Sequence, residues 1–178
     1  MKPPIIVTGP QRSGTTIAAV IKAADYHLDY VDELDFAIGN DYTNSVIQLP
    51  NALDSFVVLH HVYPNAFFVV MSRPKEDIIA SMKRIQWLRN DVQNWEFFLN
   101  DYVEQRLTRC QELLDYLPGQ SVLLDYNSLQ SHRLFASSRQ NFTSRQWKDG
   151  VPRGPAFWDS NVKCIKTYYE QRLTSSAG

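Results

Sequence analysis

The segment from Gly9 to Thr16 limits the possible folds of this chain more strongly than any other stretch. It follows a short apolar run, Ile5 to Thr8, which is typical of a buried parallel strand. Apolar side chains then recur at helical spacing, at Ile17, Val20, Ile21 and Ala24. A strand, a glycine-containing turn and a helix in direct succession indicate a βα unit at the start of an α/β fold.

The rest of the chain repeats this alternation. Further strands are predicted over residues 28–31, 67–71 and 121–125, and helices over 51–62, from Pro74 onwards, over 95–117 and over 162–173. The polar stretch from Gly39 to Pro50 is predicted to be a loop or a short helix, and residues 134–155 a long functional loop. Strands and helices in alternation predict one domain over residues 1–178, with a mainly parallel central sheet flanked by helices on both faces.

Composition and charge argue against several classes of protein. Hydrophobic residues make up 44% of the 178 residues and charged residues 21%, as in ordinary globular chains, so we do not expect disorder. The net charge of −1 argues against a nucleic-acid-binding protein that relies on general basicity. Cys110 and Cys164 belong to no CxxC pair, so neither a disulfide framework nor a zinc site is predicted. Without a signal peptide or a long apolar run, we expect a cytoplasmic protein that does not bind a membrane.

The turn from Gly9 to Thr16 has the composition of a phosphate-binding loop. Glycines allow the backbone to turn sharply, so that successive N–H groups point at one anion at a helix N-terminus. In the nucleotide triphosphatase motif G-x-x-x-x-G-K-[ST], a lysine stands at the position of Thr15 and contacts the β- and γ-phosphates. Here Arg12 is the cation instead, two residues before Gly14. The alternative interpretation is a glycine turn with an incidental arginine.

A second segment, Ser72 to Ser81, follows the clearest buried strand that the sequence predicts. Arg73 leaves the carboxyl end of that strand, where ligands bind in open α/β sheets. Ser81 lies about two turns into the following helix. An arginine at a strand end and a helical serine are suited to bind one further phosphate together. The alternative is a capped surface helix with a solvated arginine.

These two segments resemble the motifs of the sulfotransferases that use 3′-phosphoadenosine 5′-phosphosulfate (PAPS). The first family motif is a strand followed by [KR]-S-G-T-T, and the second is loosely R-x-P-x-x-x-x-x-S after a hydrophobic strand. The resemblance implies a three-layer P-loop NTPase-like α/β fold and a sulfotransferase activity. It implies that Arg73 and Ser81 hold the 3′-phosphate of PAPS. The 5′-phosphosulfate is then held by the first loop, through Gln11, Arg12, Ser13, Gly14, Thr15 and Thr16.

Two later segments are similar to the family at fewer positions. Tyr126 stands in a stretch like the family's strand-end Y-E-D-L, which places a tyrosine beside the adenine. Arg153 and Gly154 fall where the family has a basic loop that closes over the 3′-phosphate. The sequence also departs from the family, because Pro74 stands one position early and Ile17 replaces the tryptophan that stacks on adenine in many members. Adenine stacking must therefore come from elsewhere or be weaker.

Sulfuryl transfer requires the acceptor oxygen, the sulfur and the leaving phosphate oxygen to lie in line, so catalysis is mostly positioning and charge stabilisation. Arg12 is expected to neutralise the charge that develops on the leaving phosphate, and no metal is required. The acceptor needs a base, for which Glu33, its neighbour Asp32, His60 and His61 are candidates. The resemblance supports Glu33, because carbohydrate sulfotransferases use a glutamate in a comparable place, whereas cytosolic members use a histidine.

Two other functions are compatible with the sequence. A small-molecule or nucleoside kinase on the same fold would use Val122 to Asp125 as the strand and acid that hold magnesium. A non-catalytic relative would keep the nucleotide site and lack the base. For a sulfotransferase we expect a small-molecule or carbohydrate acceptor and no nucleic-acid partner, while the identity of the acceptor and the oligomeric state are left open.

Overall fold

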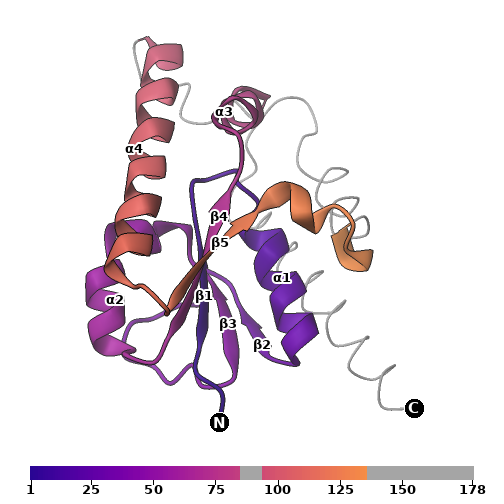
Figure 1. Ribbon diagram of the computed structural model, residues 1–178, viewed down its shortest axis with the longest axis vertical. Helices are drawn as coiled ribbons and strands as arrows, with labels where there is room; N and C mark the ends of the chain where they lie inside the picture. The colour runs from indigo at the N-terminus through magenta and orange to yellow at the C-terminus, as the bar shows by residue number, and fades with distance from the viewer. Residues whose placement is uncertain (85–93, 136–178) are drawn as a thin grey trace.

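The computed structural model of this protein describes residues 1–84 and 94–135. Within these residues, five parallel strands form one sheet in the order β2-β3-β1-β4-β5. The strands are β1 (Ile5–Thr8), β2 (Asp29–Val31), β3 (Ser45–Gln48), β4 (Phe67–Ser72) and β5 (Ser121–Asp125). Because all five run in one direction, the loops that follow them meet at the same edge of the sheet, which is the edge away from the N-terminus in Figure 1.

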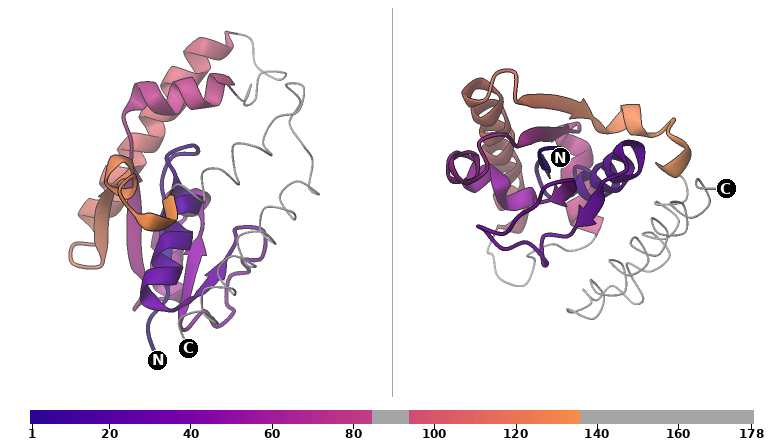
Figure 2. Two further views of the ribbon diagram at one scale, coloured as in Figure 1. Left: turned by 90° about the vertical axis from the view of Figure 1, so that its right-hand side faces the viewer. Right: turned by 90° about the horizontal axis from the view of Figure 1, so that it is seen from below.

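Helices cover both faces of this sheet (Figures 1 and 2). The helical elements are α1 (Thr15–Tyr26), η1 (Pro50–Asp54), α2 (Phe56–Val62), α3 (Lys75–Arg84), α4 (Trp95–Tyr116) and η2 (Tyr126–Leu129). Successive residues of a strand point to opposite faces, so Val7 packs in the core under α1 while Ile6 packs in the core under α2 and α4. The protein thus has the three-layer α/β fold with a parallel central sheet that the sequence predicts.

The helix α3 and the N-terminal half of α4 extend beyond the carboxyl edge of the sheet (Figure 1). They form a third apolar cluster of their own, which joins Ile78 and Met82 of α3 to Leu99 and Val103 of α4, all four fully buried. Pro74 directly precedes α3, and its carbonyl accepts the backbone N–H groups of Asp77 and Ile78 at the start of the helix. This packing places one face of α3 over the loop that follows β1.

One element of the sequence analysis is wrong. Residues 45–48, predicted as part of a loop or short helix, form β3, a strand whose four residues are all buried between β2 and β1. Only two of them, Val46 and Ile47, are strongly apolar, so the run is too short to stand out from its polar flanks. The pairing on both sides, Ile47 with Ile6 and with Val31, overrides the local preference.

The other strands and helices within the described residues are confirmed. The predicted helix over 51–62 is divided at Ser55 into η1 and α2. The predicted long loop over 134–155 begins with two core residues, Leu134 and Phe135, and its remainder lies outside the described residues, as do the helix over 162–173, Cys164, Arg153 and Gly154. No helix in the described part of the chain is both long and apolar enough to cross a membrane.

Candidate functional site

The loop between β1 and α1, residues 9–14, owes its shape to close contacts at both of its glycines. A Cβ atom at Gly9 would lie 2.9 Å from both Met71 Cβ and Ser13 Oγ, so the loop backbone rests directly on β4. Gly14 has φ 97°, and a Cβ there would lie 2.5 Å from Cδ2 of Tyr126. Glycine is therefore required at each position for space and for conformation, since Gly9 also has a positive φ, of 149°. Between them, the Ser13 N–H donates to the Pro10 carbonyl at 3.0 Å and closes the turn.

The two segments that the sequence analysis singled out touch each other directly. Arg12, which adopts a φ of 71°, donates from Nε to Oγ of Ser81 at 3.3 Å. Arg73 donates from Nη1 to the backbone carbonyl oxygen of Arg12 at 3.0 Å. Because β1 and β4 are adjacent and parallel, the loop after β1 and the start of α3 emerge side by side. The proposed clamps for two phosphates thus face the same side of the molecule.

Tyr126 joins this cluster from β5. It follows the carboxyl end of that strand, whose neighbour in the sheet is β4. Its ring lies beneath Arg73, with the guanidinium carbon 4.3 Å from the ring centroid, which is the geometry of a cation–π contact. The ring edge lies against Gly14 at the first turn of α1. Three strand ends, those of β1, β4 and β5, therefore contribute to one site.

The site is strongly positive. Burial and then the positive charges of Arg84 and Arg73 lower the pKa of Arg12 to about 10, while Tyr126 opposes the shift. Arg12 remains protonated at neutral pH, and a bound anion would relieve the repulsion among the three guanidinium groups. Within residues 1–84 and 94–135, the carboxylate paired with Arg73 is that of Asp77, at 3.9 Å and largely exposed, so it compensates little.

Arg84 is a residue that the sequence analysis missed. It lies on α3, three residues after Ser81, and residues at this spacing share one face of a helix. The pattern Ser-x-x-Arg in a helix that starts from Arg73 and Pro74 was the available signal.

Two polar groups of the site have no hydrogen-bond partner among the described residues. They are Oγ of Ser13, which is fully buried, and Nε of Arg73. A buried polar group without a partner is unfavourable, and most buried polar groups in native proteins are hydrogen-bonded. Thr15 is also buried, and Thr16 is half-buried at the first turn of α1. The arrangement of donors and cations is suited to bind an anion at the N-terminus of this helix.

Gln11 anchors the loop to α4 and η1 through its side chain. Its Oε1 accepts a hydrogen bond from the Tyr102 hydroxyl of α4 at 3.0 Å, and its Nε2 donates to Asn51 of η1 at 3.4 Å. Arg106 donates to the Tyr102 hydroxyl at 3.1 Å and also pairs with Asp54. Both polar atoms of the Gln11 side chain therefore bind other protein groups, so the predicted cofactor contact of Gln11 would be made by its backbone.

The structure separates the four candidate bases. Asp32 is buried, and its two oxygens accept hydrogen bonds from the Tyr30 hydroxyl and the Leu34 N–H, so its role is structural. Glu33 is half-buried at the carboxyl end of β2, where burial and then the charge of Asp32 raise its pKa. Only β3 separates β2 from β1, a distance of about 10 Å at the usual strand spacing. Glu33 thus lies on the same sheet edge as Arg12.

His60 and His61 lie in the last turn of α2, which precedes β4 and therefore ends at the amino edge of the sheet. The structure does not bring His61 together with Arg12 or Arg73. His60 packs edge-on against Tyr116, with ring centroids 6.2 Å apart.

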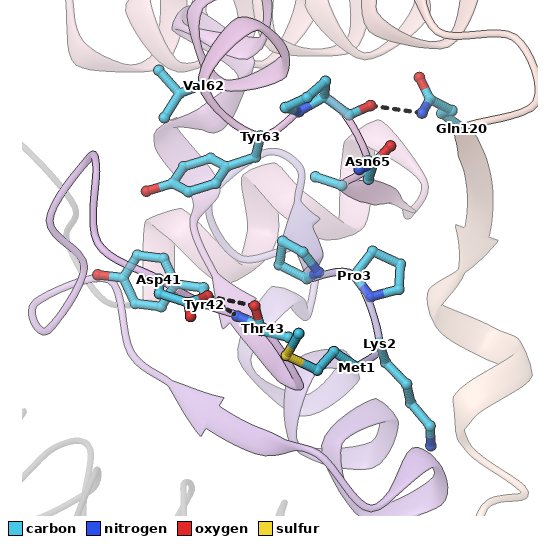
Figure 3. Close-up of a pocket in the computed structure, with 13 residues that line it drawn as sticks. Met1, Lys2, Pro3, Asp41, Tyr42, Thr43, Val62, Tyr63, Asn65 and Gln120 are labelled. Carbon is cyan, nitrogen blue, oxygen red and sulfur yellow. Dashed lines mark hydrogen bonds between the residues drawn. The ribbon is translucent and has the colours of Figure 1, made fainter.

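A cavity of about 650 Å³ also lies at the amino edge (Figure 3). Two of its lining side chains are engaged with protein: Gln120 donates to the Pro64 carbonyl, and Asp41 accepts the backbone N–H of Thr43. It lies at the end of the sheet opposite the arginine cluster formed by Arg12, Arg73 and Arg84. The unpartnered donors and the positive charge favour the carboxyl edge as the functional site.

Within residues 1–84 and 94–135, no group of three or more His, Cys, Asp or Glu side chains is placed to hold a metal ion. Cys110 is a free, buried thiol whose pKa is raised to about 12 by burial. A scan of the sequence against protein-family models gave no match, and neither did a search of the curated proteins. The functional assignment therefore rests on the geometry of the site and on the motifs.

Proposed function

We propose that this protein is a PAPS-dependent sulfotransferase, which transfers a sulfuryl group from PAPS to a hydroxyl or amine of a small-molecule or carbohydrate acceptor. The observation that carries the proposal is the direct contact between the β1–α1 loop and the start of α3. Arg12 reaches Ser81, and Arg73 reaches the carbonyl of Arg12. Cations on two adjacent strand ends are suited to a nucleotide whose two anionic groups are separate, as in PAPS.

In this proposal the loop N–H groups, Arg12 and the hydroxyls of Thr15 and Thr16 bind the 5′-phosphosulfate. Arg73 and Ser81 bind the 3′-phosphate, and Arg84 adds positive charge from the same helix face. The unpartnered Nε of Arg73 is one donor available for that phosphate.

The chemistry follows from this placement. The acceptor oxygen or nitrogen forms a bond to sulfur while the bond from sulfur to the 5′-phosphate oxygen breaks, leaving adenosine 3′,5′-bisphosphate (PAP). Arg12 and the helix N-terminus stabilise the negative charge on the leaving phosphate. Glu33 takes the acceptor proton, and its raised pKa makes it a stronger base than an exposed glutamate.

The kinase alternative receives less support from the site. The strands beside β1 end in Gln48 and Ser72, neither of which has the carboxylate that holds magnesium in such enzymes. Asp125 ends β5 at the far side of β4, and its side chain accepts the Asn127 N–H as a helix cap. Thr15 also stands where these enzymes have lysine.

Titration calorimetry with PAP, AMP and ATP, each with and without magnesium, tests the proposal. We expect PAP to bind without magnesium and at least about tenfold more tightly than AMP, because hydrogen bonds between charged partners are worth about 1.5–3 kcal/mol. Arg109→Ala, at an exposed ion pair with Glu112 on α4, is the matched control and should bind PAP as the wild type does. Equal affinity for PAP and AMP, or tighter binding of magnesium-ATP, would contradict the assignment.

Turnover distinguishes the enzyme from a non-catalytic relative. Radiolabelled PAPS incubated with a panel of alcohols, amines and carbohydrates should yield a labelled product and PAP. Binding of PAP without transfer to any acceptor, and without Glu33-dependent hydrolysis of PAPS, would favour the non-catalytic protein.

A further inference from the structure

Tyr126 lies between Arg73 and the glycine that precedes α1. Its ring face lies against the guanidinium of Arg73 at 4.3 Å, and its ring edge against Gly14. Phe135, which is buried, supports the ring from a third direction in a T-shaped contact with centroids 5.6 Å apart. The ring is thus wedged between the start of α1 and the end of β4.

Among the described residues, Arg73 has few other polar contacts. Nη1 donates to the Arg12 carbonyl at 3.0 Å, while the Asp77 carboxylate is 3.9 Å away and Nε has no hydrogen-bond partner among the described residues. A guanidinium that stacks on an aromatic ring keeps its N–H donors, which lie in its plane, available for an anion. The ring therefore holds the Arg73 guanidinium over its face through the cation–π contact, while the Arg12 carbonyl holds Nη1.

We propose that Tyr126 is a positioning residue for Arg73, and that its ring makes the site selective for nucleotides that carry a 3′-phosphate. The inference rests on the proposed function. It differs from the adenine contact that the family resemblance implies for this tyrosine, because Arg73 already occupies one face of the ring. A ring that acts through Arg73 affects the 3′-phosphate and leaves the rest of the nucleotide unaffected.

The test compares Tyr126→Phe, which keeps the ring, with Tyr126→Leu, which keeps apolar bulk without it. For each variant the ratio of the Kd for AMP to the Kd for PAP measures the contribution of the 3′-phosphate. We expect Tyr126→Phe to keep this ratio within about twofold, and Tyr126→Leu to lower it about fivefold with the affinity for AMP unchanged. Arg73→Ala should lower the ratio further, and adding Tyr126→Leu to Arg73→Ala should then have no additional effect on it.

Three results would overturn the inference. Equal losses for AMP and PAP in Tyr126→Leu would indicate an adenine contact or a purely structural role. An effect of Tyr126→Phe as large as that of Tyr126→Leu would assign the role to the hydroxyl. Additive losses in the double variant would show that the ring does not act through Arg73.

A measurement on the nucleotide-free protein separates this inference from the proposed function. Stacking on Tyr126 should shift the side-chain proton resonances of Arg73 upfield in NMR spectra of the wild type and of Tyr126→Phe. The shift should disappear in Tyr126→Leu, and its absence from the wild type would overturn the positioning role even if Tyr126→Leu fails to fold. A wild type that keeps this shift but binds AMP and PAP equally would refute the proposed function and the selectivity while the positioning role stands.

Discussion

The carboxyl ends of β1 and β4 are positive, whereas that of β2 is negative, although all three lie on one edge of the sheet. At β1 and β4, burial and the neighbouring arginines lower the pKa of Arg12. At β2, burial and Asp32 raise the pKa of Glu33, and the pKa of Tyr30 is raised well above its usual value by burial and Asp32. In both regions the charged form of the buried group is unfavourable, because it lies away from water and close to groups of the same charge.

This contrast gives the two ends different chemical capacities. The positive end gains stability when it binds an anion, so it is suited to hold a nucleotide and its leaving phosphate. The negative end gains stability when it takes up a proton, so it is suited to act as a base. A group-transfer reaction needs both a site for the leaving group and a base. Here the ends of β1 and β2 lie about 10 Å apart at the usual strand spacing.

The largest effect is expected at the negative end. Glu33→Gln removes the proposed base and should lower kcat for sulfuryl transfer by about 10²–10⁴-fold, with the Kd for PAP unchanged. The measurement is transfer from radiolabelled PAPS together with PAP titration of the same preparation. Asp29→Asn is the control, because it removes one carboxylate at the exposed start of β2, the opposite end of this strand, and should leave turnover unchanged. Equal turnover in Glu33→Gln and the wild type would remove Glu33 from the mechanism.

The same residue predicts a pH dependence. The raised pKa means that folded Glu33 keeps its proton to higher pH than unfolded Glu33 does. Turnover should therefore rise with pH through the raised pKa, while the contribution of Glu33 to the free energy of unfolding falls between its unfolded and folded pKa values. Glu33→Gln should abolish this part of the pH dependence of stability, which chemical denaturation at several pH values would measure.

The next largest effect is expected at the positive end. Arg12→Ala should weaken PAP binding by about 100-fold, because hydrogen bonds between charged groups are worth up to about 3 kcal/mol. Calorimetry at constant salt measures the loss, and Arg109→Ala controls for the removal of one positive charge. A change of less than about threefold in Arg12→Ala would show that the positive end does not bind the nucleotide through this residue.

Much of the fold follows from local sequence. The strands β1 and β4 are continuous apolar runs that end at Gly9 and just before Pro74, so periodicity and punctuation identify them. The strand β3 was missed because its two polar residues, Ser45 and Gln48, are buried by neighbours that are distant in sequence. Such burial arises only when the sheet assembles, so the local sequence cannot predict it.

The site was predictable only where its residues stand in a compact motif. Arg12 and Ser81 were identified from two short segments, and the structure places them in contact. The tie between Tyr102 and Gln11 spans 91 residues and depends on how α4 packs, so the sequence offered no signal for it. Tyr126 was identified by resemblance, but its position under Arg73 depends on β5 pairing with β4.

The cost of replacing a glycine of positive φ by alanine is expected to differ between the positive and the negative end. Gly14, at the positive end, has φ 97° and no room for a Cβ, whereas Gly39, in the loop after β2, has φ 92° and no atom within 4 Å of that position. Gly39→Ala should cost about 1 kcal/mol from backbone strain alone. Gly14→Ala should cost about 2 kcal/mol more, because Tyr126 must also move. Urea denaturation measures both, and equal losses would mean that the wedge of Tyr126 against Gly14 is soft.

The smallest effect concerns how the loop at the positive end is held in place. Tyr102→Phe removes the hydroxyl that donates to Gln11 and accepts from Arg106, so the loop before Arg12 loses one anchor. PAP affinity should fall about threefold, the consequence of one net hydrogen bond of about 0.7 kcal/mol, with no change in the ratio between AMP and PAP. Tyr116→Phe is the control, since Tyr116 ends the same helix about 20 Å further along its axis. If Tyr102→Phe instead changed the preference for the 3′-phosphate, the anchor would act on Arg73 as well, and the loop and α3 would have to be treated as one rigid unit.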